Sequence, residues 1–178
     1  MVERFTMNLD RVFGQTHAKR YLLNAIQSER FAHAYLFLGP NGVGKVATAI
    51  ELAKMLVCQK QDQAPCQECP GCTQAGSLTH PNLNFLFAHP KTAKEAELSD
   101  YRSALAAQPY QTSSPWPSAS ISIDGIRRLR KDLSLKNLEG AKRVIIILDA
   151  HLMTIEATNA LLKMLEEPPA HTYFVLTS

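Results

Sequence analysis

The chain has 178 residues, of which 46% are hydrophobic and 20% are charged. This length suits one domain with a sizeable apolar core, and the composition excludes a disordered or collagen-like chain. The 19 lysines and arginines outnumber the 16 aspartates and glutamates by a net charge of only +3, which is too small to indicate nucleic-acid binding by itself.

The chain begins with alternating helical and strand-like patterns. Apolar side chains recur at helical spacing over 18–28, and a short apolar run over 34–38 predicts a buried strand that ends at Gly39. A glycine-rich turn follows, and then a helical pattern that runs from Ala49 to Cys58. A strand, a glycine-rich turn and a helix in this order are the setting of a phosphate-binding loop.

The turn between this strand and this helix matches the G-x-x-x-x-G-K pattern of a phosphate loop. Its glycines allow backbone N–H groups to surround an anion, the helix N-terminus adds its dipole, and Lys45 is placed to reach the outer phosphates. The alternative is a plain turn between a strand and a helix. The predicted nucleotide-binding residues of the loop are Gly39, Pro40, Asn41, Gly42, Val43, Gly44, Lys45 and Val46.

The last position of this loop is chemically defective. A Ser or Thr hydroxyl normally binds Mg²⁺ there, but this chain has Val46, whose isopropyl group cannot coordinate a cation. Thr48 lies further round the helix and points elsewhere. We therefore expect ATP to bind weakly or not at all.

All four cysteines lie between residues 58 and 72. Two C-x-x-C steps in one short window, with the turn-forming residues Pro65, Pro70 and Gly71 among them, are typical of a tetrahedral zinc site. Because such a site has no open ligand position, it is structural, a knuckle over about 58–76. The alternatives are free thiols in a loop, or a redox pair, which needs only two cysteines. The predicted zinc ligands are Cys58, Cys66, Cys69 and Cys72.

An irregular segment follows the knuckle. Residues 83–87 form a second short strand pattern, and 89–120 is polar and rich in proline, which predicts an insertion, partly mobile, with a helix near 94–107. Trp116 lies in this insertion. It either packs on its own domain, which we favour, or anchors a partner.

Strands and helices alternate again toward the end of the chain. Helical patterns cover 124–136 and 154–166, and strand patterns cover 143–148 and 173–177. Strands that alternate with helices predict an α/β fold with a doubly wound parallel sheet. An apolar stripe on the last helix is expected to be core, and it consists of Ala157, Ala160, Leu161 and Met164.

The most apolar strand pattern ends in one carboxylate where an ATPase needs two. Asp149 is placed to help anchor a metal, but no neighbouring acid can act as a general base. His151 could substitute as the base, but a lone histidine near a strand end is more often a packing or surface residue, which we favour. Together with Val46, this defect predicts feeble or absent hydrolysis.

Four segments together resemble the bacterial clamp-loader subunits of the AAA+ class, which are components of the DNA polymerase III holoenzyme. They are VFGQ at 12–15, the phosphate loop, the four-cysteine knuckle and, most specifically, NALLKMLEEPP at 159–169. The resemblance covers nearly the whole chain except 89–120. It implies that 1–178 is an AAA+ P-loop NTPase-like core, with the zinc knuckle and the polar insertion built into it. The helical lid and the collar domain of the family are not among these 178 residues.

Within this family, two types of subunit compete. The segments 79–82 and 123–136 look more like a structural subunit than like an ATP-hydrolysing motor subunit of the gamma/tau type, which would keep a threonine at position 46 and a full acidic pair. Thr177 resembles the polar sensor residue that contacts the outer phosphate. A stand-alone P-loop kinase or transferase is a third candidate, but it would need a substrate pocket with its own acids and a lid.

The resemblance also implies partners and a location. The structural subunit would join gamma/tau and delta subunits in a pentamer that places a sliding clamp on primed DNA. A basic cluster either contacts DNA phosphates or is a solvated helix face, and it consists of Arg127, Arg128, Arg130, Lys131, Lys136, Lys142 and Arg143. No apolar run reaches the ~20 residues that span a bilayer, and 1–11 lacks the apolar core of a signal peptide, so we expect a cytoplasmic protein.

Overall fold

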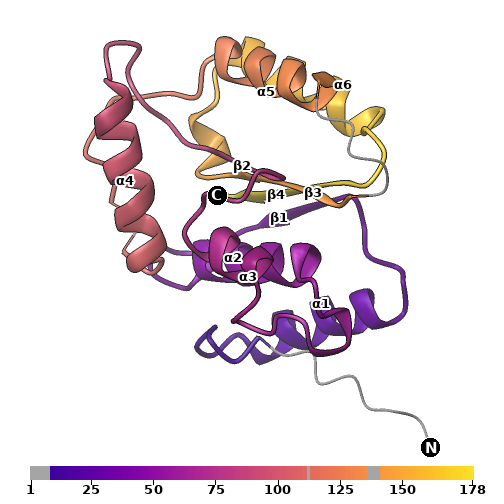
Figure 1. The fold of residues 1–178 in the computed structure, drawn as a ribbon. Helices are drawn as coiled ribbons and strands as arrows, with labels where there is room; N and C mark the ends of the chain where they lie inside the picture. The colour runs from indigo at the N-terminus through magenta and orange to yellow at the C-terminus, as the bar shows by residue number, and fades with distance from the viewer. Residues whose placement is uncertain (1–8, 112, 136–140) are drawn as a thin grey trace, which may run out of the picture.

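The structure, a computed structural model, describes residues 9–111, 113–135 and 141–178. Within these ranges it contains one parallel sheet of four strands in the order β1-β4-β3-β2 (Figure 1). The strands are β1 (Ala34–Phe37), β2 (Leu83–Leu86), β3 (Arg143–Ile147) and β4 (Thr172–Thr177). The predicted α/β fold with a parallel sheet is therefore confirmed.

Helices cover both faces of this sheet (Figure 1). The helices α1, α2 and α3 lie on one face and α5 and α6 on the other, while α4 stands beside the end of the sheet where the C-terminus lies. Two single-turn helices, Gln61–Gln63 and Ala150–Leu152, complete the described elements. The bounds are α1 Thr16–Gln27, α2 Lys45–Val57, α3 Pro70–Gly76, α4 Glu95–Ala107, α5 Ile123–Leu135 and α6 Ile155–Glu166. None of the helices in the described ranges is long and apolar enough to cross a membrane.

Strand β3 divides the core into two halves. All five of its residues are buried, and successive side chains point to opposite faces because a strand has a period of two. Val144 and Ile146 pack with the apolar side chains of α2 and α3, whereas Ile145 and Ile147 pack with those of α5 and α6. A continuous apolar run is what a strand covered on both faces requires, which is why this segment has the most apolar pattern in the chain.

The strand predicted at 34–38 is present, but the prediction that it is buried is wrong. The side chains of Leu36 and Leu38 are 54% and 70% exposed. In the described residues β1 has one strand neighbour, β4, so one of its edges is left uncovered. A short apolar run does not distinguish a central strand from an edge strand.

Of two local predictions around the knuckle and the insertion, the first is wrong and the second, our preferred position for Trp116, is confirmed. Pro70 and Gly71 do not form a turn but begin α3, where proline suits the first helical position because its missing N–H has no partner in a helix anyway. Trp116 stacks on Phe87 with ring centroids 6.2 Å apart and packs edge-on against Tyr101, so it packs on its own domain.

The predicted basic cluster is not one surface. Arg143 is only 8% exposed, and its guanidinium donates to the carbonyl oxygens of Leu133 and Ala170. Lys142 donates instead to the side chain of Gln61, away from α5. Lys136 lies outside the described residues. The part of the cluster that remains exposed on α5 consists of Arg127, Arg128, Arg130 and Lys131.

Candidate metal centre and phosphate loop

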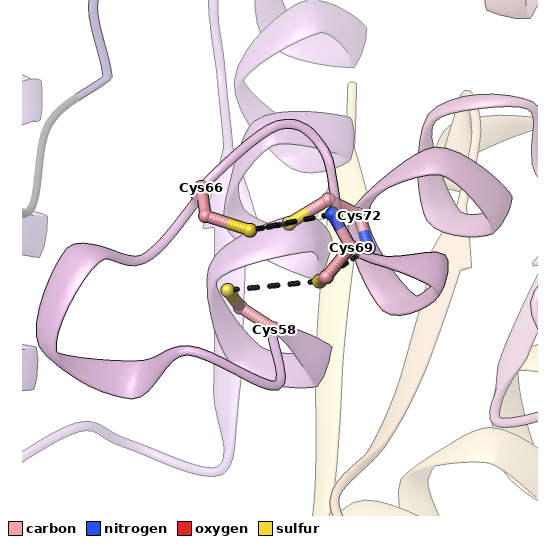
Figure 2. A group of neighbouring side chains, drawn as sticks. All are labelled: Cys58, Cys66, Cys69 and Cys72. Carbon is pink, nitrogen blue, oxygen red and sulfur yellow. Dashed lines mark hydrogen bonds between the residues drawn. The ribbon is translucent and has the colours of Figure 1, made fainter.

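The fold brings the four predicted zinc ligands together (Figure 2). Cys58 follows the last residue of α2, Cys69 is the N-cap of α3, and Cys72 lies in the first turn of that helix. The loop between the two helices supplies Cys66. A Cβ atom at Gly71 would lie 2.3 Å from the carbonyl oxygen of Val57, so only glycine allows α3 to pack this closely against the end of α2.

The distances between the sulfur atoms fit one tetrahedral metal ion. The four Sγ atoms lie within 4.8 Å of one another, and two pairs, Cys66–Cys72 and Cys58–Cys69, are 3.9 Å and 4.0 Å apart. A tetrahedron with metal–sulfur bonds of about 2.3 Å has edges of about 3.8 Å. Disulfide sulfurs would be about 2 Å apart, and all four cysteines are free thiols. This donor set therefore matches a structural metal centre.

Hydrogen bonds around the cluster favour the ionised form of one thiol, that of Cys69. The backbone N–H groups of Cys69 and Cys72 donate to the Sγ atoms of Cys66 and Cys69. Burial raises the pKa of the Cys58 and Cys72 thiols. Burial is also the largest influence on Cys69, but hydrogen bonds to the backbone of Gln59 and Cys72 and to neighbouring thiols outweigh it and lower its pKa to about 6. Cysteine binds metals as a thiolate, so this site favours the reactive form of at least one ligand near neutral pH.

A buried ion pair braces the knuckle against α2. Lys54 Nζ lies 2.5 Å from Glu51 Oε1, and the two side chains are only 8% and 6% exposed. Gln67, which lies between the second and third cysteines, donates to Glu51 Oε2 at 2.8 Å and accepts from Lys54 at 3.3 Å. The loop that carries Cys66 is thus tied to the helix by three polar side chains that satisfy one another.

The predicted phosphate loop connects β1 to α2. Gly42 and Gly44 adopt φ values of +78° and +96°, which side chains rarely tolerate, and Gly44 is the N-cap of α2. Lys45, the predicted phosphate ligand, donates from Nζ to the carbonyl oxygens of Gly39 and Pro40 at 2.6 Å and 3.0 Å. The loop therefore has the backbone shape of an anion site, while its lysine is folded back on the loop itself.

Val46 occupies the position of the usual metal-binding hydroxyl. Its side chain is 1% exposed and belongs to the apolar core on the α2 face of the sheet. The nearest hydroxyl along the helix, that of Thr48, donates to the carbonyl oxygen of Gly44 at 2.7 Å. Neither side chain offers an oxygen to a cation beside the loop.

The acidic end of the site holds one carboxylate. Asp149 follows β3 in the left-handed conformation, and its N–H donates at 3.0 Å to the Oγ1 of Thr177, which is fully buried at the end of β4. Burial raises the pKa of Asp149, although the charges of His151 and Lys45 oppose the shift. The side chain of His151 is exposed, and its Nδ1 lies 3.1 Å from the Oγ of Ser178. The two strand ends thus place Asp149 and Thr177 side by side.

The insertion contributes residues that the sequence did not point to. Pro109 and Tyr110, which follow α4, line the space beside the phosphate loop together with Leu148 and Asp149. Tyr101 of α4 lies near the same carboxylate, and burial together with that negative charge raises the pKa of Tyr101 to about 12. No spacing pattern connects these tyrosines to the loop, so local sequence carries no signal for their position.

Comparisons of the sequence with known proteins identify a family. The sequence model of the family described as "DNA polymerase III, delta subunit" matches residues 14–178. The chain is 32% identical over 162 residues to DNA polymerase III subunit delta' of Bacillus subtilis, which covers 91% of this chain and 41% of that protein. It is 33% identical over 168 residues to DNA polymerase III subunit tau of the same organism, covering 94% of this chain and 25% of that protein.

The chain therefore spans less than half the length of these curated relatives. A crystal structure of a gamma subunit-related protein of DNA polymerase III from Thermotoga maritima is 23% identical and aligns with a TM-score of 0.32. That alignment covers 55% of this chain and 35% of the other, and it is too loose to support a structural argument.

Proposed function

This chain belongs to the family of the DNA polymerase III delta subunit, and on that premise we propose that it is a structural clamp-loader subunit of the delta' type. Its proposed task is to hold the clamp loader in shape while other subunits hydrolyse ATP. The identities to delta' and to tau are nearly equal, so they do not separate the structural type from the motor type. The chemistry of the phosphate loop favours the structural type.

The observation that carries this proposal is the buried side chain of Val46. Phosphoryl transfer needs a Mg²⁺ ion held by a hydroxyl at the end of the loop and a group that orients the attacking water. Here the first position is part of the apolar core, and the strand end offers the single carboxylate of Asp149. The hydroxyl is therefore absent from its usual position, and the strand end has one carboxylate where an ATPase needs two.

We propose partners of the same machine. Gamma/tau motor subunits and the delta subunit would complete a pentamer with this chain, and the pentamer would place a sliding clamp on primed DNA. Contact with DNA would then be made through the assembly, with the exposed arginines of α5 as one candidate surface. This role puts the protein in the cytoplasm.

We also propose that the metal of the four-cysteine cluster is zinc, because four thiolates in tetrahedral arrangement are the usual ligands of structural zinc. Elemental analysis of protein prepared without chelator is expected to find about one zinc per chain. Replacing Cys72 by serine should abolish that zinc. Protein that folds and assembles with no bound metal would contradict the proposal.

An ATPase assay of the full-length protein, with and without primed DNA, tests the structural role. We expect no turnover above that of the Lys45→Ala variant. Robust hydrolysis that is lost in Lys45→Ala would instead identify a motor subunit. The Val46→Thr variant is a separate check, because restoring the hydroxyl should make nucleotide binding depend more strongly on Mg²⁺.

A further inference from the structure

The insertion covers the phosphate loop with an aromatic side chain. The Oη of Tyr110 accepts a hydrogen bond of 2.7 Å from the backbone N–H of Phe13, and the two rings pack with centroids 5.7 Å apart. On its other side the ring lies directly against Gly44, because a Cβ atom built there would be 2.8 Å from Cε1 of Tyr110. Tyr110 is thus clamped between the segment before α1 and the N-terminus of α2.

Very little room remains beside the loop under this ring. The cavity between the ring and the C-terminal half of the loop has a volume of about 10 Å³, and it is lined by Gly42, Gly44, Lys45, Val46, Pro109, Tyr110, Leu148 and Asp149. One water molecule needs ~10–15 Å³ measured in this way, so the space is at the lower limit for a single water. A phosphate group has several times the bulk of a water molecule and does not fit while Tyr110 stays in place.

The segment that ends in Tyr110 is a packed part of the domain. From α4, the side chains of Leu98, Tyr101 and Leu105 are buried in the core on the α2 side of the sheet. Beyond Tyr110 the insertion is fastened again by the stacking of Trp116 on Phe87. The ammonium group of Lys45, which would otherwise bind phosphate, donates to two carbonyl oxygens of the loop.

We propose that Tyr110 is a plug that closes the phosphate loop against nucleoside di- and triphosphates. A nucleotide binds only after the ring leaves Gly44 and the hydrogen bond to Phe13 breaks. This inference deepens the proposed structural role and rests on it, because it assigns to the insertion the exclusion of the ligand that a motor subunit would use. It concerns binding, whereas Val46 and Asp149 concern hydrolysis, so the two are separable.

Calorimetric titration of the full-length protein with Mg-ADP and Mg-ATP tests the plug. Replacing Tyr110 by alanine should tighten binding by about tenfold or more, which corresponds to about 1.4 kcal/mol. Tyr110→Phe should bind clearly more weakly than Tyr110→Ala, because the phenyl ring still fills the space, and at least as well as the parent protein, because it has lost only the hydrogen bond to Phe13. Tyr21→Ala, which removes an exposed tyrosine from α1, is the matched control and should change nothing.

Hydrogen–deuterium exchange on the unaltered protein gives a second test that does not depend on a variant folding. Millimolar Mg-ATP should increase exchange in peptides that contain Tyr110, and the emission of the single tryptophan, Trp116, should shift as the insertion moves.

The outcomes separate the plug from the proposed function. Tighter binding by Tyr110→Ala without turnover supports both. The plug is overturned by tight binding to the parent protein, by equal affinities of folded Tyr110→Ala and parent, by Tyr110→Phe binding as tightly as Tyr110→Ala, or by slower exchange around Tyr110 on addition of nucleotide. Turnover by the parent protein, lost in Lys45→Ala, overturns the structural role instead.

Discussion

The buried pair of Glu51 and Lys54 provides the sharpest test of how the knuckle is held to the domain. Both side chains are almost fully buried, and Gln67 completes their hydrogen bonds. Replacing Lys54 by methionine keeps the volume but leaves the Glu51 carboxylate with one amide donor in an apolar setting. Removing one partner of a buried pair usually costs about 3–5 kcal/mol, and the remaining Gln67 contact suggests about 3 kcal/mol here.

The assay is urea unfolding of the metal-loaded protein, followed by far-UV circular dichroism. The double variant Glu51→Leu/Lys54→Met removes both charges, and it should unfold within about 1 kcal/mol of the parent because no uncompensated charge remains. The control is Lys60→Met, which breaks the ion pair with Glu68 on the surface of the same knuckle. Those two side chains are 54% and 68% exposed, so water solvates both charges and the loss should be much smaller than that from Lys54→Met.

Two results would refute the reasoning. One is a loss from Lys54→Met no larger than that from Lys60→Met, which would mean that water reaches the pair. The other is a double variant that is as unstable as the sum of its two single variants, which would mean that the side chains do not interact.

Three further predictions concern the site. Asp149→Asn should raise the free energy of unfolding at pH 7.5 by less than about 1 kcal/mol. Burial raises the pKa of this half-exposed carboxyl, so its charged form destabilises the folded protein above that pKa, and asparagine removes the charge. Asparagine also tolerates the left-handed backbone conformation at this position. The gain should disappear as the pH falls toward 4 in urea titrations, and a gain that grows on acidification would contradict the sign. Gly71→Ala should reduce metal content because its Cβ would meet the Val57 carbonyl, whereas Gly125→Ala, which meets nothing within 4 Å, should retain the metal. Stripping the metal with a chelator should lower the thermal midpoint reversibly, with recovery on adding zinc, and an unchanged midpoint would show that the thiols do not hold a stabilising ion.

Local spacing predicted the four strands and the longer helices, though not α3, and it indicated both candidate sites. Three of the four cysteines fall at the end of one helix or the start of the next, and the loop between these helices supplies the fourth, so a short segment brings all four sulfurs together. The phosphate loop likewise depends on glycines and a helix N-terminus within a few residues of one another. The sequence alone also shows that the hydroxyl ligand for Mg²⁺ is missing, since the side chain of Val46 has no oxygen in any conformation of the helix.

Other properties were decided by the tertiary structure, because they depend on what segments distant in the chain do to one another. The order of the strands puts β1 at the edge of the sheet, where part of it is exposed. The folding of α5 over the sheet buries the Arg143 guanidinium against the Leu133 carbonyl. Tyr110 closes the phosphate loop through contacts with Phe13, 97 residues away. The type of a side chain and its neighbours in the sequence predict its contacts with residues a few positions away. Whether a side chain is buried, or whether it blocks a binding site, depends on segments that meet only when the whole chain has folded.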